Sequence, residues 1–208
     1  HPVNRRQRQM CIRDSLIPGG FGNRGISGKI EAIRYARENQ IPFLGICLGM
    51  QLSIIEFTKN VLKMKNSGSS EFGKHTNNVI SLMTEWSKKN QKVTRTKEND
   101  LGATMRLGSY PCYIKHKSLA SKIYKKKLIH ERHRHRYEVN PKYRSSIEKK
   151  GLVFSGFSKD KKLLEIIENK YHKWFLGVQF HPELKSKPFK PHPIFFSFIK
   201  NSLMNKNA

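Results

Sequence analysis

The sequence predicts an α/β protein in which a mostly parallel sheet is flanked by helices, and two observations carry this prediction. Short apolar runs end directly at glycine-rich turns, at 16–22 and again at 41–49, and a helical pattern follows each turn. Further short apolar runs continue toward the C-terminus without an internal repeat. In sheets of this kind, functional side chains gather at the carboxyl ends of strands.

The first strand and the first helix lie on either side of a glycine-rich turn. The strand ends at Ile17, and the turn occupies 18–22. Because Ile30 and Ile33 recur at helical spacing, a helix is expected over 28–39. These residues form the first strand-turn-helix unit.

A second unit of the same kind follows. The continuous apolar run 41–46 predicts a strand that is buried on both faces. A helix begins at once at Leu48 and extends to about Leu62. The polar, glycine-bearing stretch 63–78 is expected to be a loop, long enough to have a function.

The rest of the chain is expected to add strands and one terminal helix. Short apolar runs predict strands at 79–83, 110–115, 130–139, 152–157, 163–168 and 175–180. The stretch 193–203 predicts an amphipathic helix. Its apolar stripe consists of Phe195, Phe198, Ile199 and Leu203, with Ile194 at the edge.

The chain carries a large excess of basic residues. Lysine and arginine number 41 against 15 acidic residues, which gives a net charge of +26. Such a charge favours a phosphate-bearing or acidic partner where the basic residues cluster. The lysines instead form scattered pairs and triples, at 88–89, 125–127, 149–150 and 161–162. Nucleic acid is therefore not the expected partner.

Residues 1–14 are set apart from the rest. They show no strand or helix period and no initiating methionine, and the pattern changes at Ser15. We interpret them as a tag or a sequence artefact and expect one domain at 15–208. The alternative is a basic arm for nucleic acid, which no interleaved aromatic residue supports. Its arginines would be Arg5, Arg6, Arg8 and Arg13.

Cysteine use and hydropathy indicate the compartment. Cys11, Cys47 and Cys112 are far apart and form no CxxC pair, so neither a disulfide framework nor a structural zinc site is expected. Cys112 has no base nearby in the sequence and is expected to be buried and unreactive. No apolar run approaches the ~20 residues of a membrane span, and no signal-peptide core is present at the start. We expect a soluble, cytoplasmic protein without membrane contact.

The first candidate for catalysis is Cys47, between Gly45 and Gly49, where a buried strand passes into a helix. Small flanking residues permit the sharp turn of a nucleophile elbow, and neighbouring amides can face an oxyanion. The N-terminus of the helix beside the sulfur favours the thiolate. The alternative is a small apolar side chain buried in a core strand.

A thiolate nucleophile needs a base and a group that orients the base. The sequence Phe180-His181-Pro182-Glu183 supplies both at the end of another predicted strand. Pro182 restricts the turn so that His181 and Glu183 point the same way, and the carboxylate can hold one imidazole tautomer. The three residues predict a thiol-based catalytic triad.

The stretch 130–136 (HERHRHR) admits two further interpretations. His133 and His135 share one face of a strand, as metal ligands would, but no third ligand of suitable spacing is near. Arginines at every second position of the same strand fit a row of phosphates. No metal is expected, and nucleic acid remains the better of these two alternatives.

Four motifs go beyond single residues: PGGFGNRG at 18–25, GICLGMQ at 45–51, ERHRHRYEVN at 131–140 and FHPE at 180–183. Together they resemble the class I glutamine amidotransferase domain of the CTP synthase family. The longer stretches ARENQIPFLGICLGMQ, DLGATMRLGSYPC and ERHRHRYEVN are similar to that family in particular. The resemblance covers about 16–200 and implies the flavodoxin-like architecture of class I amidotransferases.

The resemblance also implies a role for individual positions. Cys47 would attack the side-chain amide of glutamine and form a γ-glutamyl thioester, while His181 moves protons and Glu183 orients it. The backbone amides of Gly20 and Leu48 would hold the oxyanion. A free amino acid demands a cation for its carboxylate and an anion for its amine. The remaining implied glutamine-binding residues are Phe21, Gly49, Met50, Gln51, Glu71 and Arg136.

The resemblance implies a larger parent protein. In the family, ammonia passes to an N-terminal synthetase domain that uses ATP and Mg²⁺ to aminate UTP to CTP, and GTP activates glutamine hydrolysis. Hydrolysis itself would need no cofactor. We expect the synthetase domain to be the partner, a homo-oligomer at full length, and a fragment that lacks the first strand and helix of its own domain. Arg106 is assigned either a structural role or a contact with the activator or that domain.

Two other functions stay open at this point. One is a different thiol-dependent amidotransferase or a γ-glutamyl hydrolase, which would share the triad but not the ERHRHRYEVN stretch. The other is a basic nucleic-acid-binding module, which would show strongly salt-dependent affinity and no glutaminase activity.

Overall fold

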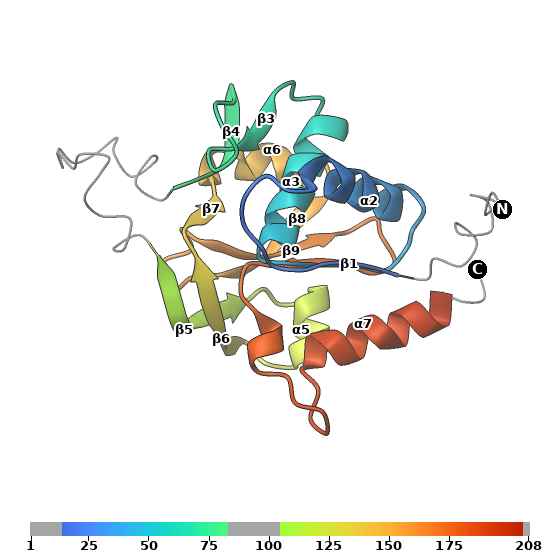
Figure 1. Ribbon diagram of the computed structural model, residues 1–208. Coiled ribbons are helices and arrows are strands. Elements are labelled where there is room, and N and C mark those ends of the chain that lie inside the picture. The colour runs from blue at the N-terminus through green and yellow to red at the C-terminus, as the bar shows by residue number, and fades with distance from the viewer. Residues whose placement is uncertain (1–13, 83–104, 206–208) are drawn as a thin grey trace.

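The computed structural model describes residues 14–82 and 105–205. Within this part of the chain, a seven-stranded sheet lies between two layers of helices, and a small three-stranded sheet lies beside it (Figure 1). The predicted α/β class is confirmed. The interpretation of 1–14 as a tag or artefact stays a prediction, because 1–13 lie outside the described residues.

The large sheet is mixed. In spatial order its strands are β1 (Ser15–Ile17), β2 (Phe43–Ile46), β10 (Phe175–Val178), β9 (Leu164–Asn169), β8 (Leu152–Phe157), β5 (Arg106–Ile114) and β6 (Leu128–His135). β2 pairs in parallel with β1 and β10, while the other neighbouring pairs are antiparallel. Parallel pairing is thus confined to three strands. Their carboxyl ends meet at one edge, where ligands bind in α/β proteins.

The helices cover the two faces of the sheet (Figure 1). One face carries α2 (Ile26–Glu38), α3 (Leu48–Asn60) and α6 (Arg144–Lys149), and the other carries α5 (Leu119–Tyr124) and α7 (Pro193–Met204). Each face has its own apolar core. Neighbouring residues of one strand alternate between the two, since Phe43 packs into the first core and Leu44 into the second.

The small sheet corrects two predictions. It contains β3 (Ser67–Ser69), β4 (Asn77–Leu82) and β7 (Tyr137–Val139). The stretch 63–78 is therefore not all loop, because the Ser-Gly-Ser of β3 pairs with β4 although it has no apolar side chain. The stretch 130–139 is two strands in two different sheets, with a bend at Arg136 between them.

The terminal helix α7 confirms the predicted helix but not its whole apolar stripe. Ile194, Phe198 and Ser202 are its buried residues. Ile199 and Leu203 are 53% and 61% exposed, which corrects the predicted stripe. The sequence analysis also does not predict α5 and α6. Both are six residues long, too short to show a helical period.

Candidate active site

Cys47 lies at the sharp turn between β2 and α3, where it is the N-cap residue of the helix. Its φ of 49° lies in the left-handed region, which non-glycine residues adopt rarely and mostly at functional sites. Its backbone N–H donates to the carbonyl oxygen of Val178 in β10 over 2.7 Å. The predicted nucleophile elbow is present, and the backbone holds it in place.

Close packing around the turn at Cys47 requires a glycine at position 49. A Cβ atom on Gly49 would collide with the carbonyl oxygen of Ile17 in β1. The first turn of α3 therefore lies directly against the carboxyl end of β1. This contact brings the glycine-rich turn that begins at Pro18 to the same edge as Cys47.

His181 and Glu183 follow β10 and lie on opposite sides of the buried Pro182. His181 Nδ1 is 2.6 Å from Glu183 Oε1, and because a carboxylate accepts, Nδ1 carries the proton. The neighbouring Cys47 thiol and the bond to Glu183 raise the pKa of His181 to about 10. Burial opposes the ionisation of Glu183, but the bond to His181 lowers the pKa of this carboxyl. The structure thus brings together all three residues of the predicted triad.

The glycine-rich turn completes the surroundings of the triad. A Cβ atom on Gly19 would lie 2.8 Å from His181 Cε1 and 3.6 Å from Cys47 Cβ. A Cβ atom on Gly20 would lie 3.4 Å from the Leu48 side chain. Gly20 and Leu48, the two residues whose amides were assigned to the oxyanion, are therefore neighbours beside the sulfur.

Cys47 opens into a cavity of about 210 Å³, which we call the Cys47 pocket. Six residues singled out in the sequence line it: Gly20, Phe21, Cys47, Gln51, Glu71 and Arg136. Four others were not predicted, and these are Met105, Arg134, His135 and Tyr137. Leu48, Gly49 and Met50 are buried in the first turn of α3 and are not among the lining residues.

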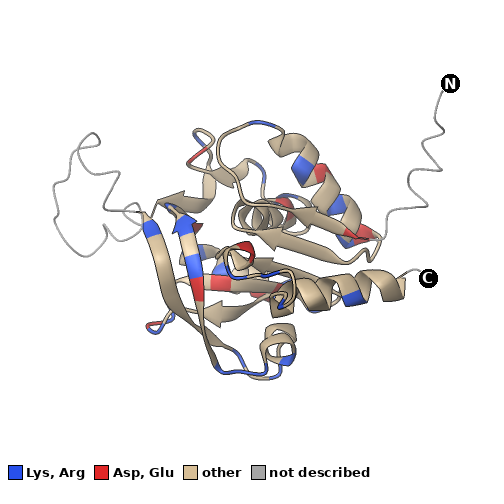
Figure 2. Cartoon of the chain, turned by 60° about the horizontal axis from the view of Figure 1, so that its bottom comes forward, with Lys and Arg blue, Asp and Glu red and all other residues tan. Residues whose placement is uncertain are grey.

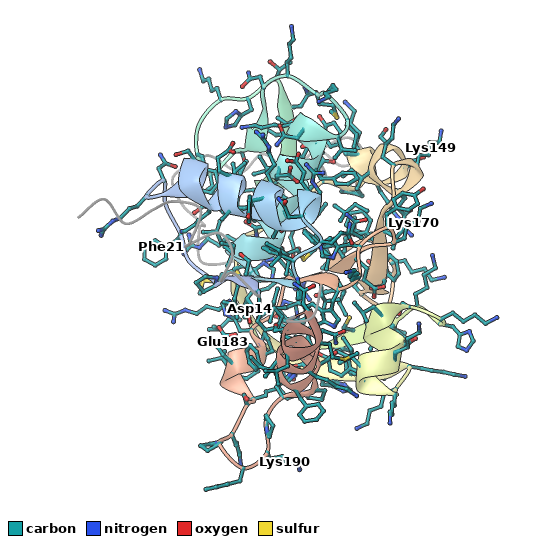
Figure 3. The ribbon with its side chains drawn as sticks, turned by 90° about the vertical axis from the view of Figure 1, so that its right-hand side faces the viewer. Asp14, Phe21, Lys149, Lys170, Glu183 and Lys190 are labelled. Atoms are coloured by element: carbon teal, nitrogen blue, oxygen red, sulfur yellow. The ribbon has the colours of Figure 1, made fainter. Side chains whose placement is uncertain are left out.

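Charged groups of both signs line the Cys47 pocket: the acidic Glu71 and the basic Arg134 and Arg136. Arg136 comes from the bend between β6 and β7, and Glu71 comes from the turn after β3. Glu71 Oε1 also accepts from the N–H of Gly22 over 3.1 Å, which connects its turn to the glycine-rich turn. Phe21 stands away from the body of the protein and is 91% exposed (Figure 3). A zwitterionic ligand fits this arrangement.

Two buried amides lie beside Cys47, and one of them, Gln51, lines the Cys47 pocket. Gln51 Nε2 donates to the Tyr137 carbonyl oxygen over 3.0 Å and to Gln179 Oε1 over 3.2 Å. Gln179 Nε2 in turn lies 3.7 Å from Cys47 Sγ. The sequence analysis missed Gln179, and its position immediately before the Phe-His-Pro-Glu motif was the available signal.

Two histidines of β6 contact one another inside the protein. His133 and His135 both point inward and bond to one another, with 2.8 Å between His133 Nδ1 and His135 Nε2. No group of three or more metal-ligating side chains occurs in residues 14–82 and 105–205. Arg106 is buried and pairs with Glu138 and Glu165 at 3.0 and 2.9 Å, which supports its structural interpretation.

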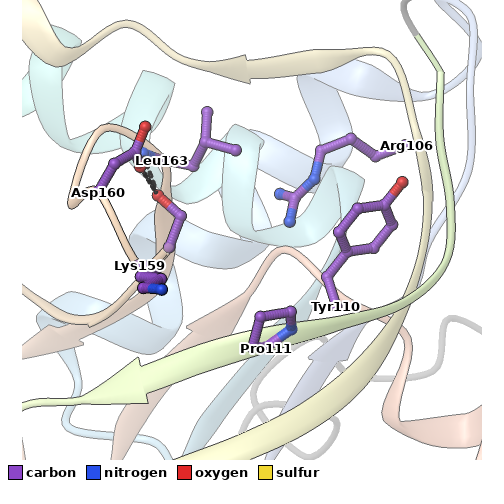
Figure 4. A pocket seen from close by; sticks show the side chains of 7 residues that line it. Arg106, Tyr110, Pro111, Lys159, Asp160 and Leu163 are labelled. Carbon is purple, nitrogen blue, oxygen red and sulfur yellow. Dashed lines mark hydrogen bonds between the residues drawn. The ribbon is translucent and has the colours of Figure 1, made fainter.

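A second cavity lies away from the triad. It has a volume of about 650 Å³ and shares no lining residue with the Cys47 pocket (Figure 4). Arg106, Tyr110 and Pro111 line it together with 158–160 and Leu163. Ser158 Oγ donates to Asp160 Oδ1 in this cavity, and neither cysteine nor histidine is among its lining residues. Cys112, as expected, is buried, and burial raises the pKa of its thiol.

Basic residues are distributed over helices, strands and loops of the described chain and do not form one stripe (Figure 2). Among the lysine pairs that the sequence analysis names, 88–89 lies outside the described residues. No helix in the described part of the chain is long and apolar enough to cross a membrane.

The comparisons with known proteins cover nearly the whole chain. The family model for class I glutamine amidotransferases matches residues 2–201. The CTP synthase of Pelagibacter ubique is 61% identical over 195 residues, which are 94% of this chain and 36% of that protein. The CTP synthase of Aquifex aeolicus is 56% identical over 199 residues, with coverage of 95% and 36%. The chain thus spans about a third of these relatives.

Solved structures agree. The glutaminase domain of Trypanosoma brucei CTPS, solved with bound acivicin, is 37% identical with a TM-score of 0.83, and the match covers 98% of this chain and 77% of that one. A putative GMP synthase protein from Thermoplasma acidophilum, 16% identical with a TM-score of 0.57, shares the fold; the match covers 97% of this chain and 78% of that one. The chain belongs to the class I glutamine amidotransferases and is similar, over nearly its whole length, to the glutaminase portion of CTP synthases.

Proposed function

We propose that the chain hydrolyses glutamine with Cys47 as nucleophile, His181 as proton carrier and Glu183 as the group that orients His181. The observation that carries the proposal is a thiol at a strained strand-helix turn, beside a His181–Glu183 pair and in the wall of a pocket lined by one acidic and two basic groups. Membership of the class I glutamine amidotransferases supports it.

The chemistry proceeds in two halves. The Cys47 sulfur attacks the side-chain amide carbon of glutamine, and the N–H groups of Gly20 and Leu48 stabilise the oxyanion. His181 gives its proton to the departing nitrogen, so ammonia leaves and a γ-glutamyl thioester remains on Cys47. Water then attacks the thioester, its proton passes to His181, and glutamate is released. The raised pKa of His181 suits the first half, because the imidazole is protonated when the amine leaves.

Glutamine is recognised at its charged end. In the proposed complex Arg136 binds the α-carboxylate, and Glu71 binds the α-ammonium group. Phe21 lines the mouth of the pocket, and the first turn of α3, with Gly49, Met50 and Gln51, supports the substrate from below. The hydrolysis requires no cofactor, since the thiol, the imidazole and the backbone amides supply every group that the reaction uses.

The ammonia serves a second reaction in a longer protein. The relatives named CTP synthase are about three times as long as the part that matches. By analogy with them, we propose that a synthetase domain elsewhere in the parent protein uses ATP and Mg²⁺ to aminate UTP to CTP, with GTP as activator. A homo-oligomer in the cytoplasm is the expected form of that protein.

Glutaminase assays on this chain and on its full-length parent test the proposal. Cys47→Ser is expected to remove ammonia release from glutamine by at least about 10³-fold. Cys112→Ser is the matched control, because it changes the other described thiol, which lies among core residues and not in the Cys47 pocket. Equal ammonia release by Cys47→Ser and the wild-type parent would overturn the proposal.

A further inference from the structure

A chain of buried polar groups runs from β9 to the wall of the Cys47 pocket. Glu165 Oε2 lies 3.3 Å from His133 Nε2, and His133 Nδ1 lies 2.8 Å from His135 Nε2. His135 Nδ1 then lies 3.2 Å from the carbonyl oxygen of Tyr137. Glu165, His133 and His135 are 0%, 1% and 7% exposed, so all three side chains are buried. None of these three side chains has a role in the proposed hydrolysis.

The direction of each hydrogen bond follows from the acceptor at one end. The carbonyl oxygen of Tyr137 only accepts, so His135 Nδ1 carries a hydrogen. In a neutral imidazole the other nitrogen, Nε2, is then an acceptor, and His133 Nδ1 must donate to it. His133 Nε2 is consequently an acceptor as well. A donor must face it, and the group that faces it is Glu165 Oε2.

The charges around the chain favour two neutral imidazoles. Arg106 of β5 faces both histidines, and His181 faces them from the segment after β10. Burial and the nearby Arg106 lower the pKa of His133 to about 2 and that of His135 to about 3. Tyr110 of β5 completes the surroundings with an edge-on ring contact to His133.

One buried cation lies between two buried carboxyl groups. Arg106 Nη1 donates to Glu138 Oε1 over 3.0 Å, and Arg106 Nη2 is 2.9 Å from Glu165 Oε1. A single guanidinium balances a single negative charge. Glu138 Oε1 accepts a hydrogen bond from Arg106, whereas neither oxygen of Glu165 accepts a hydrogen bond within the described chain, so Glu138 is the better anion. Burial raises the pKa of both carboxyl groups, which opposes a second negative charge beside Arg106.

We propose that Glu165 is a neutral carboxylic acid that donates from Oε2 to His133, and that this chain holds His135 as the uncharged Nδ1–H tautomer in the wall of the pocket. Glu165 and His133 are positioning residues for the site. The name of the pocket's ligand rests on the proposed glutaminase function, but the protonation pattern does not.

The chain reaches the nucleophile through the Tyr137 carbonyl. This oxygen accepts from His135 on one side and from Gln51 on the other. Gln51 bonds to Gln179, and Gln179 lies against the Cys47 sulfur. An unbroken series of donors and acceptors therefore sets the place of the bend at Arg136 relative to Cys47. A change of tautomer at His135 would remove the donor on one side of this series.

Nitrogen-15 spectra of the imidazoles in the full chain test the protonation pattern directly. We expect His133 and His135 to show the neutral Nδ1–H tautomer and no titration between about pH 5 and pH 8. A His133 with its hydrogen on Nε2, or titration of either ring in that range, would overturn the proposal. This result does not depend on glutamine turnover, so it separates failure of the proposal from failure of the proposed function.

Two matched substitutions in β9 extend the test. Glu165→Gln keeps a donor toward His133, so the tautomers of both histidines are expected to stay the same. The melting temperature should stay within a few degrees of wild type, and the KM for glutamine within about twofold. Glu168→Gln is the control, because both Glu168 oxygens accept from backbone N–H groups, of Leu119 and Ala120, each over 2.8 Å. An amide offers one acceptor, so this variant is expected to melt lower. A tautomer change at His133 in Glu165→Gln would contradict the neutral acid.

Discussion

The two halves of the large sheet prepare the site by different means. The parallel strands β1, β2 and β10 place Cys47 and the His181 turn through backbone geometry, with close contacts that only glycine permits. The antiparallel strands β5, β6 and β9 hold buried charged and polar side chains behind one wall of the pocket, to which β6 contributes Arg134 and His135. The first half therefore depends on shape, and the second depends on the balance of charge and protons.

The largest expected effect is on the stability of the antiparallel half of the large sheet. Arg106→Met leaves two buried carboxyl groups without their cation and is expected to lower the free energy of unfolding by about 3–5 kcal/mol. Burial raises the pKa of Glu138 to about 8 despite Arg106. The Glu138 pKa is higher in the folded state than in the unfolded state, so Glu138 lowers stability as the pH rises from the unfolded-state pKa toward the folded-state pKa. The loss of unfolding free energy in Arg106→Met should therefore be larger at pH 8 than at pH 5.

Denaturant unfolding of wild type and Arg106→Met at the two pH values measures this effect. Arg132→Met is the control, since Arg132 points outward from β6 and is exposed. A loss that is equal at pH 5 and pH 8 would mean that Glu138 is not the group left uncompensated.

The next effect concerns the His181–Glu183 pair, which we propose activates Cys47. Glu183→Gln removes the carboxylate that orients His181 and is expected to lower kcat for glutamine by about 10²-fold. It should also change the pH dependence of stability. The pKa of His181 is raised to about 10 in the folded protein, whereas in the unfolded chain it lies near 6.5. The His181–Glu183 pair therefore stabilises the fold fully below about pH 6.5, and this contribution is lost as the pH rises toward 10.

Thermal unfolding across this pH range, together with kcat, measures both consequences. The melting temperature of wild type should exceed that of Glu183→Gln most clearly below pH 6.5, and the two should converge toward pH 10. A gap that widens with pH has the wrong sign for a raised His181 pKa.

The shape of the parallel half is tested by adding one methyl group. Gly49→Ala places a Cβ against the Ile17 carbonyl oxygen and is expected to cost about 1–3 kcal/mol of stability through displacement of α3. Gly28→Ala in α2 is the matched control, because no atom lies within 4 Å of the added Cβ. The control should be neutral or stabilising, by up to about 1 kcal/mol. Denaturant midpoints distinguish the two, and equal midpoints would contradict close contact at the elbow.

The smallest expected effect is on substrate binding at the wall. Arg136→Ala should raise the KM for glutamine by about tenfold or more with a smaller change in kcat, because it removes a contact made equally in the ground and transition states. Steady-state kinetics with Arg132→Ala as control provide the measurement. A loss confined to kcat would assign Arg136 to the reaction itself and not to binding.

The sequence was informative about the parallel half because its geometry leaves local signals. Glycines on both sides of Cys47, and a proline between His181 and Glu183, are direct requirements of the turns that carry them. The strand and helix positions around 41–60 followed from the same short-range pattern. The three residues of the predicted triad accordingly lie together in the structure.

The wall was harder to predict because it depends on contacts between distant segments. The alternation of His133 and His135 with arginines indicated a shared face, but only the fold shows that Glu165 lies opposite them. Gln179 meets Gln51 across 128 positions of the chain. The bend at Arg136 and the pairing of β3 also arise from tertiary contacts, so local pattern alone did not reveal them.

The central claim is that Cys47 forms a covalent bond to the substrate, and mass spectrometry of protein quenched in acid during turnover tests it most directly. The account predicts one glutamyl group per chain on the peptide that contains Cys47, and none on the peptide that contains Cys112. The adduct should disappear in Cys47→Ser and accumulate when water attack is slowed. A glutamyl group on Cys112, or steady ammonia release from glutamine by Cys47→Ser, would contradict the account.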